Sequence, residues 1–240
     1  MLSEVSRLIV HCCHHRVGTL WFKTVLGSCA ETFGLKFFEG EQSDLPRDTA
    51  IFLQNHSKIR VRKLPPFRGT HMIRDLRDVV VSGYYYHLSC EEEWCLVPQR
   101  RFGGRSYQDV LRTLGHDDGI EFEMRYAAAA TFREMASWNY GDPRFLELKY
   151  EDLIADEARV FARIFEHYGF GAQEQRRALE IALSKSFERV TNRPVGVSED
   201  GHHLRRGMPG QWREEFTAKH VALSEQLFGK GLVRLGYPLH

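Results

Sequence analysis

Residues 14–21, with the sequence HHRVGTLW, combine the residue types that an anion-binding loop needs. They follow a short apolar run at residues 7–12 that predicts a β-strand, and they precede a stretch of helical character. A loop that enters a helix offers free backbone N–H groups and the positive end of the helix dipole. Gly18 lets the backbone approach an anion closely, and Thr19 adds a hydroxyl donor. We therefore predict a phosphate-binding loop directly after the first strand.

This loop differs from the loop that binds nucleoside triphosphates, G-x-x-x-x-G-K-S/T. Lys23 and Thr24 match the end of that pattern, but Val17 and Phe22 occupy its two glycine positions. The sequence therefore disfavours a small-molecule kinase or another nucleotide-dependent phosphotransferase, which stays open as an alternative. A requirement for magnesium would favour that alternative.

A second segment places Arg74 at the end of a predicted strand and Ser82 eight residues later on a predicted helix. Arginine presents a planar fork that matches phosphate, and serine supplies a further hydroxyl donor. We predict that both bind a phosphate group. The alternative is a strand-end arginine that pairs with Asp78, together with an ordinary helix serine.

Two further segments lie toward the carboxyl end of the chain. Tyr150 stands where a predicted strand becomes a helix. Residues 189–210 are rich in charges, glycine and proline and predict a long loop, a feature that is usually functional in compact domains. Arg205 and Arg206 precede Gly207 near the end of this loop, where two basic side chains can fold over a bound phosphate.

The elements that must position these residues alternate between strand and helix. This order predicts an α/β fold with a mostly parallel central sheet flanked by helices. No repeat, low-complexity tract or linker interrupts the sequence, so residues 1–240 are predicted to form a single domain. The expected strands are 7–12, Ile51–Gln54, His71–Arg74 and Phe145–Tyr150, and the expected helices lie near Asp78–Leu88, Gly119–Trp138, Asp152–Tyr168, 172–184 and 211–228.

The distribution of charge says more about partners than the net charge does. With 33 basic and 32 acidic side chains, the net charge of +1 by itself excludes no class of partner. Local basic clusters on a neutral chain suit a compact anionic ligand better than a long polyanion such as a nucleic acid, which usually demands a basic domain. No apolar stretch approaches the ~20 residues of a membrane span, and the first residues lack the apolar core of a signal peptide. The 5 cysteines, irregularly spaced, favour reduced thiols and a cytoplasmic location.

The run His11-Cys12-Cys13-His14-His15 contains potential metal ligands. Adjacent residues cannot all reach one tetrahedral ion, and no second ligand pair follows at the spacing of a zinc site. We predict no metal site there.

Taken in order, the four segments resemble the motifs of the sulfotransferase family that uses 3′-phosphoadenosine 5′-phosphosulfate (PAPS). Those motifs read P-K-S-G-T-T-W, R-x-P-R/K-D-x-x-x-S, Y-E-D and R-K-G-x-x-G-D-W, and the similar segments here span residues 14 to 216. Each string is weak alone, but four in the right order identify the chain as a family member. The resemblance implies PAPS as donor, adenosine 3′,5′-bisphosphate (PAP) as product, a small-molecule acceptor and no metal.

The resemblance also implies roles for individual residues. The loop backbone holds the 5′-phosphosulfate, Trp21 and the Ser186-Phe187 pair lie near adenine, and Tyr150 frames the nucleotide pocket. Core packing remains the alternative for Trp21, Phe187 and Tyr150. The implied cofactor-binding set is Arg16, Val17, Gly18, Thr19, Leu20, Trp21, Arg74, Ser82, Tyr150, Ser186, Phe187, Arg205, Arg206 and Gly207.

The implied catalytic pair is Arg16 and His56. Arg16 stands where the family has a lysine, and its guanidinium can stabilise charge on the departing phosphate without donating a proton. His56 follows the strand 51–54, where the family has its general base, although the surrounding K-S/T-H-L-P string is absent and a surface-loop histidine is the alternative. The lysine-to-arginine change leaves open a relative that binds the nucleotide without turnover.

Overall fold

A computed structural model of the chain describes residues 7–186, 189 and 207–239. The chain divides into two compact units. The sheet unit comprises Met1–Arg74 and Ser137–Pro194, and the helical unit comprises Asp75–Ala136 and Val195–His240. The single domain over residues 1–240 stays a prediction.

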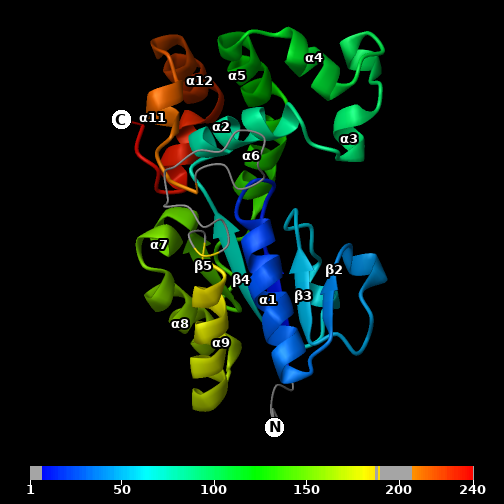
Figure 1. Cartoon of the computed structure of the whole chain (residues 1–240), viewed down its shortest axis with the longest axis vertical. Helices are drawn as coiled ribbons and strands as arrows, with labels where there is room; N and C mark the ends of the chain where they lie inside the picture. Colours follow the sequence, from blue (N-terminus) through cyan, green and yellow to red (C-terminus); the bar gives the residue numbers. More distant parts are fainter. Residues whose placement is uncertain (1–6, 187–188, 190–206, 240) are drawn as a thin grey trace. The chain divides into compact units, whose positions relative to one another are not determined.

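The sheet unit contains a five-stranded, all-parallel sheet in the order β2-β3-β1-β4-β5 (Figure 1). This arrangement confirms the predicted α/β fold with a parallel sheet. Its strands are β1 (Leu8–Cys12), β2 (Phe37–Glu39), β3 (Ile51–Gln54), β4 (Phe67–Ile73) and β5 (Phe145–Lys149). Its helices are α1 (Thr19–Phe33), α7 (Tyr150–Ala155), α8 (Glu157–Tyr168) and α9 (Ala172–Ser184), with short 3-10 turns η1 (Gln42–Asp44) and η2 (Val61–Lys63).

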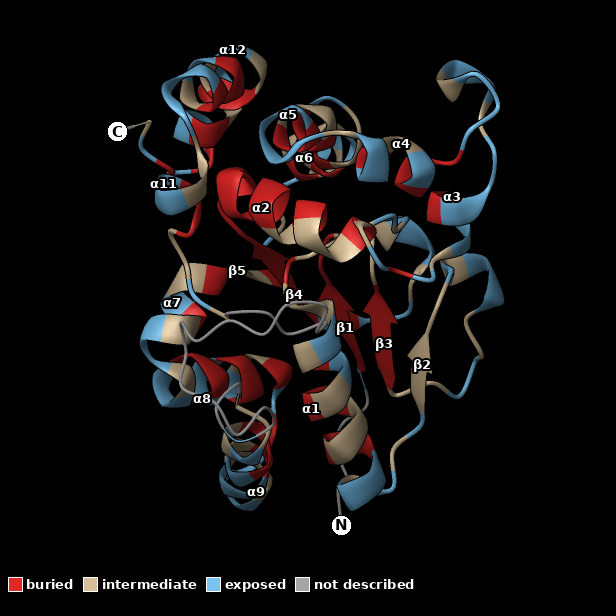
Figure 2. Ribbon diagram, turned by 45° about the horizontal axis from the view of Figure 1, so that its top comes forward, coloured by how far each residue is buried: buried red, intermediate tan, exposed pale blue. Residues whose placement is uncertain are grey.

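The central strands are buried on both faces (Figure 2). On one face, His11 of β1 stacks on Phe22 of α1 at 3.8 Å, and Thr70 of β4 bonds to the hydroxyl of Tyr168 in α8. The opposite face carries an apolar cluster of alternate strand residues and of side chains from connecting segments, namely Leu8, Val10, Cys12, Phe52, Phe67, Phe145, Phe38, Leu45, Ile59, Val61, Leu64 and Trp138. Period-two alternation explains why β1 contributes to both faces.

The helical unit packs aromatic side chains around Tyr107, which is fully buried and whose ring centroid lies 4.8 Å from that of Phe122. Two of its helices begin with capping boxes, Ser106 with Asp109 and Thr217 with His220. Its elements are α2 (Leu76–His87), α3 (Glu93–Leu96), η3 (Arg100–Phe102), α4 (Tyr107–Thr113), α5 (His116–Arg125), α6 (Ala127–Ser137), α11 (Trp212–Glu215) and α12 (Ala218–Arg234).

Several predicted boundaries were wrong for local reasons. The helix predicted over 119–138 is two helices, because the backbone at Tyr126 departs from helical geometry (φ −117°, ψ −81°). The helix predicted over 152–168 is also two, because Asp156 leaves the helix and accepts the N–H of Arg159 as the cap of α8. The predicted strand 71–74 begins earlier, at Phe67, and the short strand β2 was missed.

Two buried strand histidines predict how stability depends on pH. Burial lowers the pKa of His11 well below the usual 6.5, with a smaller contribution from His71, and burial also lowers the pKa of His71. Below pH 6.5 the unfolded chain therefore binds more protons than the folded protein, so stability falls as pH falls. We expect each histidine to cost up to about 1.4 kcal/mol per pH unit of acidification, measured by urea unfolding between pH 7.5 and 5.5. His11→Gln should have a shallower pH dependence than the wild type, and an equal slope would contradict this account.

Candidate active site

The phosphate loop, residues 13–18, joins β1 to α1. Within it the N–H of Val17 donates to the carbonyl of His14 at 3.0 Å, and Arg16 and Gly18 have φ of +62° and +78°. Helix α1 begins at Thr19, and no side chain caps its amino end. The first-turn N–H groups have no acceptor within the helix, and such donors at the amino end of a helix can bind an anion.

Gly18 is required by conformation and by space. Its φ lies in the left-handed region that other residues rarely adopt. A Cβ at this position would lie 2.6 Å from Cε of Met72 in β4 and 3.5 Å from the ring of Tyr150. The loop therefore rests directly on β4 and on the first residue of α7, which places Tyr150 beside it.

Arg74 follows β4 and is almost completely buried, with 5% of its surface exposed. Its guanidinium lies 4.4 Å from the ring centroid of Tyr150, and Nη1 donates to the carbonyl of Arg16 at 3.3 Å. Nε is buried without a hydrogen-bond partner, and among the described residues no carboxylate pairs with Arg74. Burying an unpaired charge is costly, so this donor set beside the loop fits a phosphate group.

The loop that carries His56 lies against the phosphate loop. The hydroxyl of Thr19 donates to Oδ1 of Asn55 at 2.8 Å, and Oγ of Ser57 donates to the carbonyl of Cys13 at 2.9 Å. His56 itself is half-buried, and its backbone N–H donates to Oε1 of Gln54 at 2.8 Å. The residues on both sides of His56 are therefore fixed to the segment that is predicted to hold the sulfonate.

Backbone strain marks the same two loops. In the described part of the chain, Arg16 (φ +62°) and Ser57 (φ +55°) are the non-glycine residues with positive φ. Such conformations cost free energy and cluster at functional sites. Both predicted catalytic positions are therefore in, or next to, strained backbone.

The residues predicted near adenine lie at the ends of helices in the sheet unit. Trp21, in the first turn of α1, is half-buried and packs edge-to-face on Phe161 of α8 at 5.7 Å. Ser186 is half-buried two residues after the end of α9. Its predicted partner Phe187 lies outside the described residues, as do Arg205 and Arg206.

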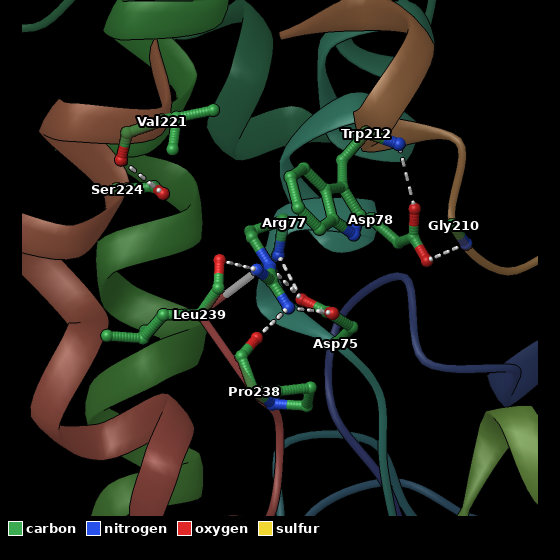
Figure 3. A network of polar contacts seen from close by, with 9 residues as sticks. All are labelled: Asp75, Arg77, Asp78, Gly210, Trp212, Val221, Ser224, Pro238 and Leu239. Carbon is green, nitrogen blue, oxygen red and sulfur yellow. Dashed lines mark hydrogen bonds and ion pairs between the residues drawn. The ribbon is translucent and has the colours of Figure 1, made fainter. Parts of the chain in front are cut away.

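In the helical unit, Asp78 of α2 fixes the segment that follows the predicted loop. Its carboxylate accepts the N–H of Gly210 at 2.6 Å and that of Trp212 at 3.1 Å (Figure 3). Ser82 lies one turn further along α2 and is half-buried, and Gly207 has φ +65°. Asp78 thus holds the backbone of the fourth segment at Gly210 and Trp212.

Arg77 forms a second anchor that the sequence analysis missed. Its guanidinium donates to both carboxylate oxygens of Asp75, at 3.0 and 2.7 Å, and stacks on the ring of Trp212 at 3.9 Å. It also donates to the carbonyls of Pro238 and Leu239 near the end of the chain (Figure 3). The sequence contains a signal for this anchor, because the family string R-x-P-R/K-D places a basic residue and an aspartate at positions 77 and 78.

We expect Asp78→Asn to lower the free energy of unfolding by about 1–3 kcal/mol. An amide has one acceptor oxygen, so one of the two backbone N–H groups would lose its partner. Urea unfolding measures the effect, and Asp117→Asn, at an exposed aspartate of the same unit, is the matched control. A loss for Asp78→Asn no larger than that of the control would contradict the anchoring role.

In the described ranges, no group of three or more histidine, cysteine, aspartate or glutamate side chains is arranged to hold a metal ion. The same residues include no helix with the length and apolar composition needed to cross a membrane.

Comparison with known proteins gives the family. Residues 63–236, more than half of the chain, match the family profile of the sulfotransferase domain. Mouse sulfotransferase SULT7A1 complexed with PAP is similar with a TM-score of 0.63 and 16% identity, over 94% of this chain and 84% of that chain. Retinol dehydratase, in complexes with androsterone and inactive cofactor PAP and with retinol and PAP, gives TM-scores of 0.59 and 0.58 at 16% identity, over 93% of this chain and 80% of that chain. Curated proteins gave no significant match. The structural likeness shows the fold, and from the profile match the chain belongs to the sulfotransferase family.

Proposed function

We propose that the protein transfers the sulfonate group of PAPS to a hydroxyl or amine of a small-molecule acceptor. The observation that carries this proposal is Arg74, a buried guanidinium with a partnerless Nε, no carboxylate partner among the described residues, and a position beside the phosphate loop. A phosphate dianion would supply what this site lacks. Support comes from the PAP in the complexes of SULT7A1 and retinol dehydratase, and from the androsterone and retinol bound by the latter.

In this proposal the loop backbone of residues 17–20 holds the 5′-phosphosulfate. Arg74 and Ser82 bind the 3′-phosphate, joined by Arg205, Arg206 and the N–H of Gly207. Tyr150 supports Arg74 through its ring face, and adenine lies near Trp21 and the pair Ser186-Phe187. The resemblance to the family assigns these contacts, and the neighbourhood of Arg74, Gly18 and Tyr150 supports them.

The proposed reaction is an in-line displacement at sulfur. The acceptor oxygen or nitrogen forms a bond to sulfur while the bond from sulfur to the bridging phosphate oxygen breaks. His56 accepts the proton that the acceptor loses. Arg16 and the amino end of α1 stabilise the charge on the departing phosphate oxygen, which has a low pKa and needs no proton.

The structure gives the phosphotransferase alternative little support. Phe22 stands at one of the two glycine positions of the triphosphate loop, and it is a fully buried core residue that stacks on His11. The chain therefore lacks, at that position, the glycine that a close backbone approach to a triphosphate requires. The other alternative is a family member that binds the nucleotide without catalysing transfer, and the experiment below distinguishes it. We also propose a cytoplasmic location, because all five cysteines are free thiols.

Release of PAP tests the proposal. The protein is incubated with PAPS and a panel of phenols, sterols, primary alcohols and amines, and PAP is quantified by chromatography. Parallel reactions contain ATP and magnesium in place of PAPS. Acceptor-dependent PAP release supports sulfonate transfer, formation of ADP with phosphorylated acceptor supports the phosphotransferase, and tight PAP binding without turnover of any acceptor supports a binding protein.

A further inference from the structure

A polar network lies next to the phosphate loop in the sheet unit, with two buried imidazoles and the carboxylate of Glu147, whose side chain is 31% exposed. Nε1 of Trp138 donates to Oε1 of Glu147 at 2.9 Å, and the other carboxylate oxygen lies 2.6 Å from Nδ1 of His71. Nε2 of His71 lies 2.9 Å from Nε2 of His14, the second residue of the phosphate loop. Both imidazoles are fully buried. We call these four residues, Trp138, Glu147, His71 and His14, the histidine network.

The sheet register brings the network together. His71 of β4 pairs directly with Glu147 of β5 on one side and with Cys12 of β1 on the other. His14 follows Cys12 by two residues, and Trp138 stacks on His71 at 4.1 Å. The network therefore lies on the sheet face of the apolar cluster, opposite the face of His11. Polar groups in an apolar core are costly unless every member is satisfied, so this placement calls for a reason beyond packing.

In the histidine network, the hydrogen bonds from His14 through His71 to Glu147 all donate in one direction. Burial lowers the pKa of His71, although its bond to Glu147 opposes the shift, so this imidazole is neutral near pH 7. Its Nδ1–H donates to the carboxylate, which leaves Nε2 as an acceptor. His14 must therefore carry its proton on Nε2 and donate it to His71. One carboxylate fixes the tautomers of two histidines in series.

The backbone of His14 is hydrogen-bonded to the part of the phosphate loop that is proposed to bind the anion. Its carbonyl accepts the N–H of Val17 at 3.0 Å. Val17 begins the loop backbone, residues 17–20, that is proposed to hold the phosphosulfate. Because His71 holds the imidazole of His14, the peptide group of His14 and the turn that follows it are less free to rotate.

We propose that His71 and Glu147 are positioning residues that hold His14, and through it the phosphate loop, in the conformation that binds the nucleotide. This inference rests on the proposed function. Nucleotide affinity then depends on a carboxylate that does not touch the nucleotide. Substitution in the network should weaken PAP binding without removing any group that contacts PAP.

Glu147→Gln tests the proposal, because an amide cannot accept from both Trp138 and His71. The amide NH₂ would face Nδ1 of His71, which reverses the tautomer of His71 and then that of His14. Nitrogen-15 NMR of the imidazoles reads the tautomers, and calorimetry with PAP reads the affinity. We expect Nδ1–H for His71 and Nε2–H for His14 in the wild type, with both reversed and PAP bound about tenfold more weakly in the variant.

Two further variants make the result specific. Glu147→Asp keeps a carboxylate and should retain the wild-type tautomers and most of the affinity. Glu39→Gln, at a half-buried strand carboxylate that pairs with Lys23, is the matched control and should bind PAP like the wild type. A wild-type His14 protonated on Nδ1, or equal PAP affinity in Glu147→Gln and the wild type, would overturn the inference. Failure of the wild type to bind PAP would instead overturn the proposed function.

Discussion

Arg74→Ala is expected to weaken the binding of PAP by about a hundredfold while changing the binding of adenosine 5′-phosphosulfate far less. Only the first of these ligands has a 3′-phosphate. Truncating one partner of a buried, charge-assisted contact typically costs 2–5 kcal/mol, because the remaining charge loses both its counter-ion and its solvent. Titration calorimetry with the two ligands measures the difference directly.

The free protein gives this experiment a second readout. Arg74 is 5% exposed, has a buried Nε without a partner and, within the described residues, pairs with no carboxylate. Removing such a charge should leave the melting temperature of the free protein unchanged or raise it, because the charge is unpaired until phosphate binds. A ligand-binding role thus predicts lost affinity without lost stability. Loss of stability alone is the outcome expected of a structural arginine.

Arg68→Ala is the matched control for Arg74→Ala. Arg68 lies on β4, the strand that Arg74 follows, is exposed and donates to the carbonyl of His167 at 3.0 Å. Its removal should leave the affinity for both nucleotides unchanged. Equal losses for PAP and adenosine 5′-phosphosulfate in Arg74→Ala would show that Arg74 does not distinguish the 3′-phosphate, and would remove it from that role.

Local patterns predicted the parts of the site that depend on short stretches of chain. The apolar run before the phosphate loop, Gly18 and the change to helical character together gave β1, the loop and α1 in the right places. The strand Ile51–Gln54 was predicted with the bounds that it has in the structure. Both predictions rest on hydrophobic periodicity and on the conformational freedom of glycine, which act over a few residues.

Contacts between distant residues could not be predicted in this way. The partners of His71, His14 and Glu147, lie 57 and 76 positions away from it in the sequence. Only the strand order of the sheet places them together. The same holds for Asp78, whose partners Gly210 and Trp212 lie 132 and 134 positions away. The sequence motifs therefore predicted which residues are candidates for the site. The fold was needed to show which residues hold them in position.

The general base is the role for which local sequence gives the least support. The family string around the histidine is absent here, yet Asn55 and Ser57 tie this segment to Thr19 and Cys13. An acceptor hydroxyl has a pKa far above neutral, so its attack on sulfur needs a partner that takes its proton in the transition state. His56 stands between these two anchored residues.

His56→Ala is expected to lower turnover by roughly 10²–10⁴-fold, the usual contribution of general base catalysis, while PAP binding stays nearly intact. The reason for this division is that the proposed base touches the acceptor and not the nucleotide. Steady-state rates with PAPS and an acceptor from the panel, together with PAP calorimetry, measure the two effects separately. His167→Ala, at a half-buried histidine of α8 that bonds to the carbonyl of Arg144, is the control and should retain wild-type rates. Near-normal turnover in His56→Ala would exclude it as the base and direct the search to His14 and His15 beside the phosphate loop.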